Sequence, residues 1–442
     1  MDLIFALTLS FTLLLTSVFR GYFIAYPLFA SMLIFMAVLM RRGFSLKSLL
    51  KMAFQGSQKS FSVLNVLLLI GVVTAIWMAA GTVPAIVYYG IQLIHPQYFI
   101  VATFILCGFV SLLLGTSFGT VSTVGIALMI MAKGSGINPH LVAGAIIAGA
   151  YVGDRCSPMS SSANLIATVT QTKLYTNIQN MWRTALVPLV VSALIYALLS
   201  LLNPVQITDQ TFTTELSRVF KIHGIDLLPA IAILVLAILQ IEVRLSMVIS
   251  VVVAGAIALF YQHYPLIDLL KFAVVGFGLE DSTPLQTILL GGGLLSMVKV
   301  SIVVVISTAF VGIFAGTQAL KSIERFLERS RGGDRFLSTC LVGIGTAAFG
   351  CTQTIAILLT QQLVQKKYKE NEKGHYKLAL DLENTVVVLA PLIPWNIAGL
   401  VPATILNTDA GFIPFAIYLY LLPLLNLIHI RLSTPPKLSL CN

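Results

Sequence analysis

Polar side chains gather in three places within segments that are otherwise apolar. In the first, residues 115–123, two glycines and several hydroxyl side chains interrupt an apolar run. Glycine permits unwound backbone, and freed carbonyl groups together with hydroxyls are oxygen ligands suited to a hard cation. The hydroxyl candidates for such a site are Thr116, Ser117, Thr120, Ser122 and Thr123. A face of small residues that packs two membrane helices together would have the same composition, so both interpretations stay open here.

The second cluster, residues 153–164, contains the charged neighbours Asp154 and Arg155 in a run that is apolar on both sides. Charges in such a setting are costly unless they pair or face water. Pro158 has no amide hydrogen and is expected to break the helix. Desolvation favours a protonated carboxyl group and a bound cation favours the ionised one, so Asp154 could exchange a proton for a cation. Alternatively, Asp154 and Arg155 form a pair that only stabilises the fold. Further candidates in this cluster are Ser157, Ser160, Ser161 and Asn164.

The third cluster lies between residues 381 and 396 and contains two prolines, Pro391 and Pro394, which predict another broken helix. Glu383 is the second carboxylate that we expect at the site, whereas Asp381, nearer a basic loop, is expected to be a helix-end charge. The other candidates here are Asn384, Trp395 and Asn396. An earlier group, predicted to lie opposite Ser122, consists of Thr352, Gln353 and Thr354.

The elements that position these clusters follow from composition. Of 442 residues, 57% are hydrophobic and only 10% are charged, too few to cover a surface in water. Apolar runs of about 18–20 residues, long enough to cross a bilayer, recur along the chain. We therefore predict an all-α polytopic membrane protein with about 11–14 membrane segments. The stretches 140–170, 285–320 and 378–408 are too long for one straight crossing and carry Gly, Pro or polar clusters, so we expect broken or re-entrant helices there.

The remaining composition argues against other classes. The net charge of +10 comes from basic residues in short loops, which is the positive-inside pattern rather than a nucleic-acid surface. The five cysteines form no CxxC pair, so neither disulfides nor a bound metal are expected. The histidines fall at predicted span ends or in loops without a catalytic motif, which argues against an enzyme. Asp2 stands where a signal peptide would be basic, so the first span is expected to be retained.

The chain also repeats itself. Residues 49–56 resemble 269–276, 80–82 match 315–317, 118–120 resemble 349–351, and 157–158 resemble 390–391. The order is the same and the offset nearly constant, at about 220–235 residues, which indicates a duplication. The predicted organisation is a first transmembrane repeat (1–202), a polar linker (203–226), a second repeat (227–432) and a cytoplasmic tail (433–442).

Loop charges indicate that the two repeats have opposite orientations. The loops 41–59, 321–335 and 366–377 are rich in Lys and Arg, whereas the loop that matches each of them is not. The positive-inside rule then places these three loops and both termini in the cytoplasm, and the linker 203–226 outside. Inverted repeats with broken helices are typical of secondary transporters, which bind their substrate at the midplane between the repeats.

Three strings resemble a known family. Residues 115–125, 153–165 and 391–399 are similar to the signature segments GTSxGTxxTxG, GDKxSPLSDTTNL and SPLIPWNxxG of NhaC-type sodium/proton antiporters, and residues 291–297 resemble the family's GGxxSM stretch. The similarity extends over about residues 45 to 410. It implies an ion-transporter-type fold, exchange of Na+ for H+ without a cofactor, and the inner membrane of a bacterium; some relatives carry malate and lactate or amino acids instead.

The chain departs from the family pattern at two positions. Ser161 and Asn384 stand where the family has carboxylates. Either the stoichiometry differs or an organic substrate supplies the missing charge. Three hypotheses follow: Na+/H+ antiport with Asp154 and Glu383 as Na+ ligands, Na+- or H+-coupled transport of an amino acid or small carboxylate, or a membrane enzyme. The expected partners are the lipid bilayer and a small ion or organic substrate, with a homo-oligomer possible and no nucleic acid.

Overall fold

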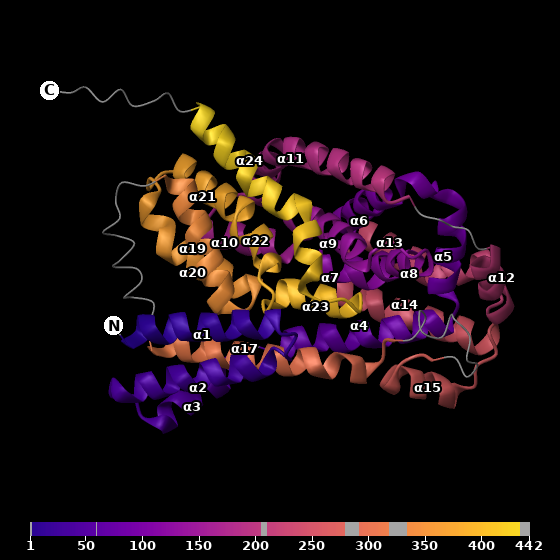
Figure 1. Ribbon diagram of the computed structural model, residues 1–442, viewed down its shortest axis with the longest axis horizontal. Coiled ribbons are helices and arrows are strands. Elements are labelled where there is room, and N and C mark those ends of the chain that lie inside the picture. The colour runs from indigo at the N-terminus through magenta and orange to yellow at the C-terminus, as the bar shows by residue number, and fades with distance from the viewer. Residues whose placement is uncertain (1, 59, 205–209, 279–290, 318–333, 434–442) are drawn as a thin grey trace.

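The computed structural model describes residues 2–58, 60–204, 210–278, 291–317 and 334–433. This part of the chain consists of helices and their connections and contains no β-strand, only an isolated bridge between Phe277 and Gly291 (Figure 1). The prediction of an all-α membrane protein is therefore confirmed.

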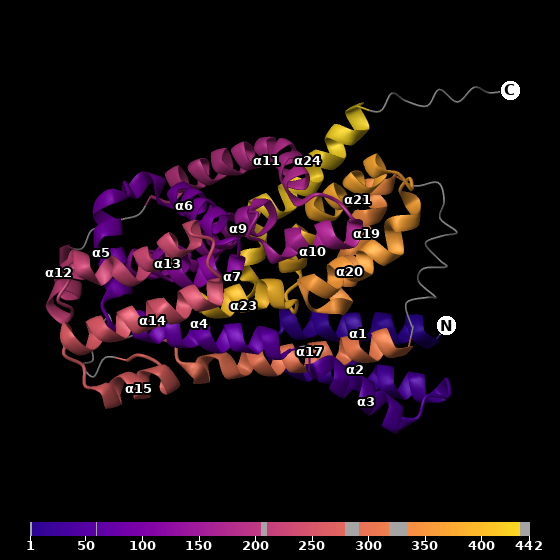
Figure 2. The same cartoon turned by 180° about the vertical axis from the view of Figure 1, so that it is seen from behind.

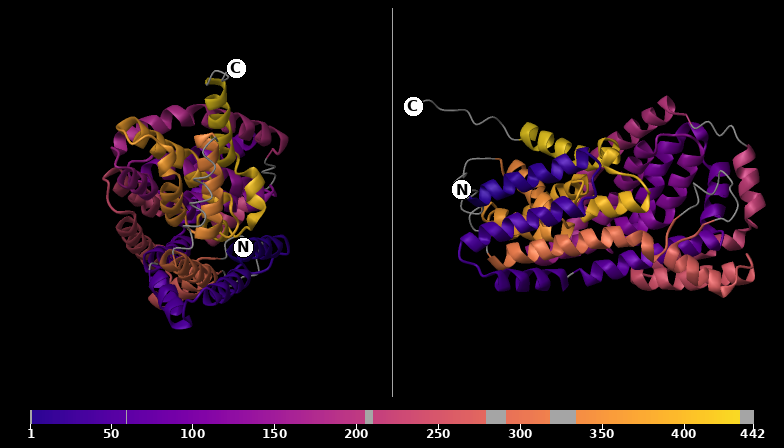
Figure 3. Two further views of the ribbon diagram at one scale, coloured as in Figure 1. Left: turned by 90° about the vertical axis from the view of Figure 1, so that its left-hand side faces the viewer. Right: turned by 60° about the horizontal axis from the view of Figure 1, so that its bottom comes forward.

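One layer of helices lies along the lower side of the molecule in Figure 1 and is set apart in the end-on view of Figure 3. It comprises α1 (Asp2–Phe19), α2 (Ala25–Arg41), α3 (Leu46–Gln58), α4 (Phe61–Ala79), α14 (Val243–Phe260), α15 (Leu266–Val275) and α17 (Val298–Thr317). Helices α3 and α17 cross where Gly56 faces Gly312, and a Cβ at Gly56 would lie 2.7 Å from the Gly312 Cα. Glycine thus permits direct backbone contact within this layer.

The second body contains the predicted polar clusters (Figure 2). Its helices are α6 (Phe99–Leu114), α7 (Ser117–Thr120), α8 (Ile126–Gly134), α9 (Pro139–Cys156), α10 (Ser161–Thr170), α11 (Leu174–Leu202), α19 (Arg335–Gly350), α20 (Gln353–Val364), α21 (Glu372–Asn384), α22 (Val386–Leu389), α23 (Ile397–Ile405) and α24 (Ile417–Ser433). Helix α9, whose side chains from Leu141 to Cys156 are all buried, lies at the centre of this body.

Close packing of α6 against α9 depends on Gly153. A Cβ built at this position would lie 2.0 Å from the backbone carbon of Ser111. Gly153→Ala is therefore expected to force the helices apart and to lower the free energy of unfolding by about 1–3 kcal/mol, measured by thermal unfolding in detergent. Gly255→Ala in α14 is the matched control, because no atom lies within 4 Å of that Cβ position. Equal melting temperatures for the two variants would contradict the packing argument.

The number of membrane segments can be compared with the prediction. Five helices of the described residues are long and apolar enough to cross a membrane, and two bent pairs raise the number to seven. The same ranges contain five shorter apolar helices of 10–17 residues, so at most twelve apolar segments are available. The predicted range of about 11–14 is reached only if these shorter helices also count as membrane segments.

Two of the three predicted helix breaks are confirmed. The stretch 140–170 divides into α9 and α10, and 378–408 divides with a bend of 51° before α23. The break expected in 285–320 stays a prediction: Leu294–Thr317 is one continuous helix, but the residues before Gly291 that would form the other part of a broken helix lie outside the described ranges. Its glycines precede that helix: Gly291, Gly292 and Gly293 all have positive φ. Residues 285–290 and 318–320 lie outside the described ranges.

Three further helices complete the description of the fold. They are α5 (Thr82–Leu93), α12 (Gln210–Val219), which lies within the predicted linker 203–226, and α13 (Leu228–Ile238). Figure 1 places the start of α1, the α2–α3 and α20–α21 connections and the end of α24 at one end of the molecule, with α5, α12 and α15 at the other.

Candidate functional site

Two helices begin in the same way after a break in the chain. Helix α6 ends at Gly115 in the left-handed region (φ 67°), and the Thr116 hydroxyl then accepts a hydrogen bond from the Gly119 amide at 3.5 Å. Helix α19 ends at Cys351 (φ 52°), and the Thr352 hydroxyl accepts from the Ile355 amide at 3.3 Å. The N-caps Thr116 and Thr352 are therefore structural counterparts.

A second pair of breaks repeats this relation. Ser160 caps α10 by accepting from the Ala163 amide at 3.2 Å, and Asn396 caps α23 by accepting from the Ala398 amide at 3.0 Å. Because Ser160 corresponds to Asn396, Pro158 corresponds to Pro394. The sequence match had paired Pro158 with Pro391, so its register was wrong by three residues. The paired caps support the duplication itself.

The Asp154 carboxylate lies between the first residues of two such helices. Its Oδ1 accepts from the Ser117 amide at 3.3 Å, and its Oδ2 accepts from Gln353 Nε2 at 3.1 Å. Ser117 begins the 18-residue helix Ser117–Gly134, and Gln353 begins α20. The N-terminal amide of one helix and a side chain from the first turn of the other therefore face one buried carboxylate, which is 5% exposed. Gln353 also donates to the Val387 carbonyl at 3.1 Å, so its carboxamide links α9 to α22.

Glu383 is the second buried carboxylate, and its environment is different. It lies in the last turn of α21 and is 1% exposed. Neither carboxylate oxygen has a hydrogen-bond partner within the described ranges. The charges of Asp154 and Arg155 both act on Glu383 across the protein interior, the first repelling and the second attracting an ionised carboxylate. A buried polar group without a partner is costly.

Arg155 does not pair with Asp154. Its fully buried guanidinium donates to the Met181 carbonyl at 3.3 Å, to the Thr184 hydroxyl at 3.0 Å and to the Asn384 side-chain oxygen. Successive residues of a helix point in different directions, and here Asp154 faces Ser117 and Gln353 instead. The alternative that these two neighbours form a structural ion pair is therefore wrong.

Asp381 has the structural role that its position suggested. It lies in the last turn of α21 and forms an ion pair with Lys377, with Nζ and Oδ1 2.9 Å apart. The Tyr368 hydroxyl donates to its other oxygen at 2.8 Å. Although Asp381 is as buried as Glu383, its charge is matched.

The other predicted residues do not all converge on the carboxylates. Thr120, Ser122 and Thr123 donate to backbone carbonyls of their own segment, where Val121–Gly125 is a π-helix. Three side chains at the helix breaks donate to backbone carbonyls of neighbouring helices: Ser157 to Leu112, Trp395 to Ala348 and Asn396 to Ala347. Ser161, Asn164 and Thr354 are exposed.

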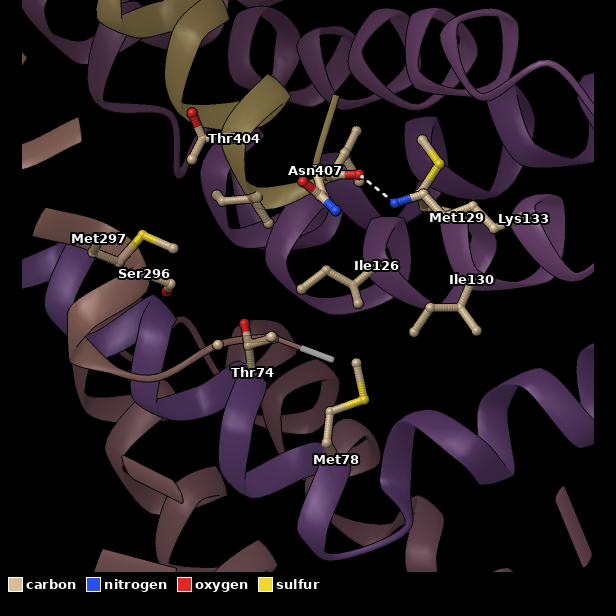
Figure 4. Close-up of a pocket in the computed structure, with 14 residues that line it drawn as sticks. Thr74, Met78, Ile126, Met129, Ile130, Lys133, Ser296, Met297, Thr404 and Asn407 are labelled. Carbon is tan, nitrogen blue, oxygen red and sulfur yellow. Dashed lines mark hydrogen bonds between the residues drawn. The ribbon is translucent and has the colours of Figure 1, made fainter. Parts of the chain in front are cut away.

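A cavity of about 300 Å³ lies apart from these residues (Figure 4). It is bordered by α4, α8, residues 291–297 and the end of α23, and includes none of the predicted site residues. Lys133 lies at its edge, and its ammonium donates to the Leu406 carbonyl at 3.4 Å. The sequence did not predict this cavity, because its lining mixes apolar and polar side chains from segments that are far apart in the sequence.

Broken helices whose N-termini face a buried carboxylate define a polytopic membrane protein of the secondary-transporter class. The sequence profile of the Na+/H+ antiporter family matches residues 1–168 and 149–432, and the chain belongs to this family.

Similar proteins differ in what their names say they exchange. The chain is 29% identical over 418 residues to the malate-2H+/Na+-lactate antiporter of Bacillus subtilis, covering 93% of this chain and 88% of that protein. It is 28% identical over 388 residues to the Na+/H+ antiporter NhaC of Alkalihalophilus pseudofirmus (85% and 84% covered). It is 27% identical over 370 residues to the arginine/ornithine antiporter ArcD of Halobacterium salinarum (81% and 76% covered).

Proposed function

We propose that this protein exchanges Na+ for H+ across the bacterial inner membrane by alternating access, with Asp154 and Glu383 as the midplane carboxylates that bind the two ions in turn. The family and the NhaC relatives support antiport. The residue assignment is supported chiefly by Glu383, whose two oxygens are buried and have no partner in the described part of the chain.

The two carboxylates have complementary properties for such an exchange. Asp154 receives donors from a backbone amide and a carboxamide, which stabilise its ionised form. Glu383 has no such donors, so in the buried state it is stable only with a proton or a cation bound. Na+ as cargo would find carboxylate oxygens and nearby backbone carbonyls, the ligands that it prefers. Because one site cannot hold both ions at full occupancy, binding of either displaces the other.

The test is purified protein in liposomes that contain a pH-sensitive dye. With an inward-acid pH gradient imposed, external Na+, Li+, K+, dicarboxylates and amino acids are added in turn. We expect internal alkalinisation on addition of Na+ or Li+ without any organic substrate. A pH change that requires an organic acid or amino acid would reject Na+/H+ exchange as the function.

A second candidate is exchange of a small organic acid or amino acid, coupled to Na+ or H+. Two relatives bear the names of such antiporters. In addition, the Arg155 guanidinium contacts the neutral Asn384, at a position where the family pattern has a carboxylate. A guanidinium whose partners are neutral is suited to bind a substrate carboxylate.

The variants Ser161→Asp and Asn384→Asp, tested singly and together, distinguish the two candidates. A carboxylate at position 384 would occupy the guanidinium of Arg155 and repel a substrate carboxylate, so organic-substrate uptake is expected to collapse if that candidate is correct. Na+/H+ exchange is expected to persist in all three variants. Ser161→Asp alone is the control, because Ser161 is exposed. If Asn384→Asp still takes up radiolabelled organic substrate, Arg155 does not bind the substrate carboxylate.

We also propose that both termini and the basic loops 41–59, 321–335 and 366–377 are cytoplasmic, with the linker 203–226 outside. Single cysteines at His95, in the α5–α6 connection, and at Glu372, which begins α21, are both exposed probes. An impermeant thiol reagent added to intact cells is expected to label position 95 and not position 372. The opposite pattern would reverse the topology. Position 209 in the linker would serve equally, but it lies outside the described residues.

A further inference from the structure

Arg155 is a permanent positive charge that the structure buries without a direct anionic partner. The side chain is 0% exposed. Its hydrogen-bond acceptors are the Met181 carbonyl, Thr184, Asn384 and the Cys156 sulfur, all of them neutral groups. Its Nε atom has no acceptor within the described ranges. A buried charge needs compensation from some other group.

Two carboxylates of the same region can compensate the charge of Arg155. Arg155 and Glu383 attract each other through the interior, and Asp154 is the next residue along α9. The other buried acid of this region, Asp381, is already matched by Lys377. The described core of the second body therefore contains two unmatched carboxylates, Asp154 and Glu383, and one unmatched cation, Arg155.

We propose that Arg155 is the resident counter-charge of the transport site and that it makes the exchange electroneutral, with one H+ moved for each Na+. With both carboxylates ionised, the three groups carry a net charge of −1. One bound H+ or one bound Na+ then makes the loaded site neutral, and in either loaded form the site crosses the membrane interior without net charge. The unloaded site is charged, and the cost of moving a buried charge through the low-dielectric interior prevents uncoupled return.

This inference depends on the proposed Na+/H+ exchange, but its prediction is separate. If charge moved with the exchange, the membrane potential would drive it. One elementary charge moved across 100 mV is equivalent to about a 50-fold change in the equilibrium ion ratio. For electroneutral exchange the Na+ ratio follows the proton ratio alone, at every potential.

The experiment uses the full-length protein in liposomes with a fixed pH gradient. Valinomycin and K+ gradients clamp the potential at 0 or about −100 mV, and the final ²²Na+ ratio is measured. We expect the same ratio at both potentials, within about twofold. A shift of about 50-fold would overturn the inference while leaving Na+/H+ exchange intact. Absence of Na+/H+ exchange at both potentials would reject the proposed function, and the inference with it.

Variants test whether Arg155 is responsible. Arg155→Lys preserves the charge and is expected to keep exchange independent of potential. Asn384→Asp adds a negative charge next to the guanidinium, so that two protons neutralise the site whereas a single Na+ leaves it with a charge of −1. Exchange of two H+ for one Na+ moves net charge, and the final Na+ ratio is then expected to depend on potential. Arg155→Gln is expected to have the same effect if this variant folds. If it does not fold, Asn384→Asp alone tests the assignment. Potential-independent exchange in a folded Asn384→Asp or Arg155→Gln variant would contradict the assignment.

Discussion

Glu383→Gln is expected to reduce Na+/H+ exchange to about 1% of the wild-type rate or less, while the protein still inserts and folds. Glutamine matches the shape of glutamate but neither binds a transferable proton nor offers a negative charge to Na+. The fold should tolerate it well, because the wild-type carboxylate has no hydrogen bond to lose within the described residues.

The measurement is the initial rate of Na+-dependent dye response in liposomes, normalised to the amount of folded protein. Asp381→Asn is the matched control, since Asp381 lies on the same helix and is equally buried but is paired with Lys377 and Tyr368. This control should lower thermal stability and keep pH-dependent exchange. Exchange at the wild-type rate in Glu383→Gln would remove Glu383 from the mechanism.

Asp154→Asn should abolish coupled transport for a different reason. Both carboxylate oxygens of Asp154 accept hydrogen bonds, one from the Ser117 amide and one from Gln353. An asparagine side chain has one acceptor oxygen and one donor group, so one of the two helix ends would face a donor. Loss of this bond costs about 1–3 kcal/mol of stability, which is compatible with a folded protein, and the negative charge for the cation is lost.

The same liposome assay measures exchange in Asp154→Asn, and binding of Na+ is followed separately by its effect on the melting temperature. We expect Na+ to stabilise the wild-type protein and not the variant. Asp409→Asn is the control, because the Asp409 side chain is 80% exposed and lies in a connection next to His140. If Asp154→Asn retained both exchange and Na+ stabilisation, the carboxylate would have only a structural role.

The breaks near Pro158 and Pro394 could be predicted because their cause is local. Proline removes a backbone donor and so ends a helix. A polar cluster inside an apolar segment also indicates a helix end, where backbone groups are free to bond with polar side chains. The pairing of Gln353 with the first repeat was predictable in outline from the duplication. Its partner proved to be Asp154 rather than Ser122, because the true register follows the helix caps at Thr116 and Thr352.

Three features depend on where side chains and chain segments point in the folded protein, which the spacing of residues in the sequence does not determine. Asp154 and Arg155 are adjacent in sequence, but the helix turns their side chains towards different neighbours, so their apparent pairing was misleading. Ser161 begins a new helix after a break, and the path of the chain through the break determines that it is exposed. Trp395 lies in a polar motif, yet its indole donates to the Ala348 carbonyl, a contact between distant segments.

The correspondence of Ser160 with Asn396 has a consequence for the ancestry of the protein. Counting back equally from these caps, the residue of the second repeat that corresponds to Asp154 is Ala390, and the one that corresponds to Arg155 is Pro391. A symmetric dimer of one ancestral repeat would have placed identical residues in both halves. Two halves encoded separately can differ, so that one half keeps an acidic turn while the other supplies the neutral Gln353 that binds it. The two halves are therefore not interchangeable at this site.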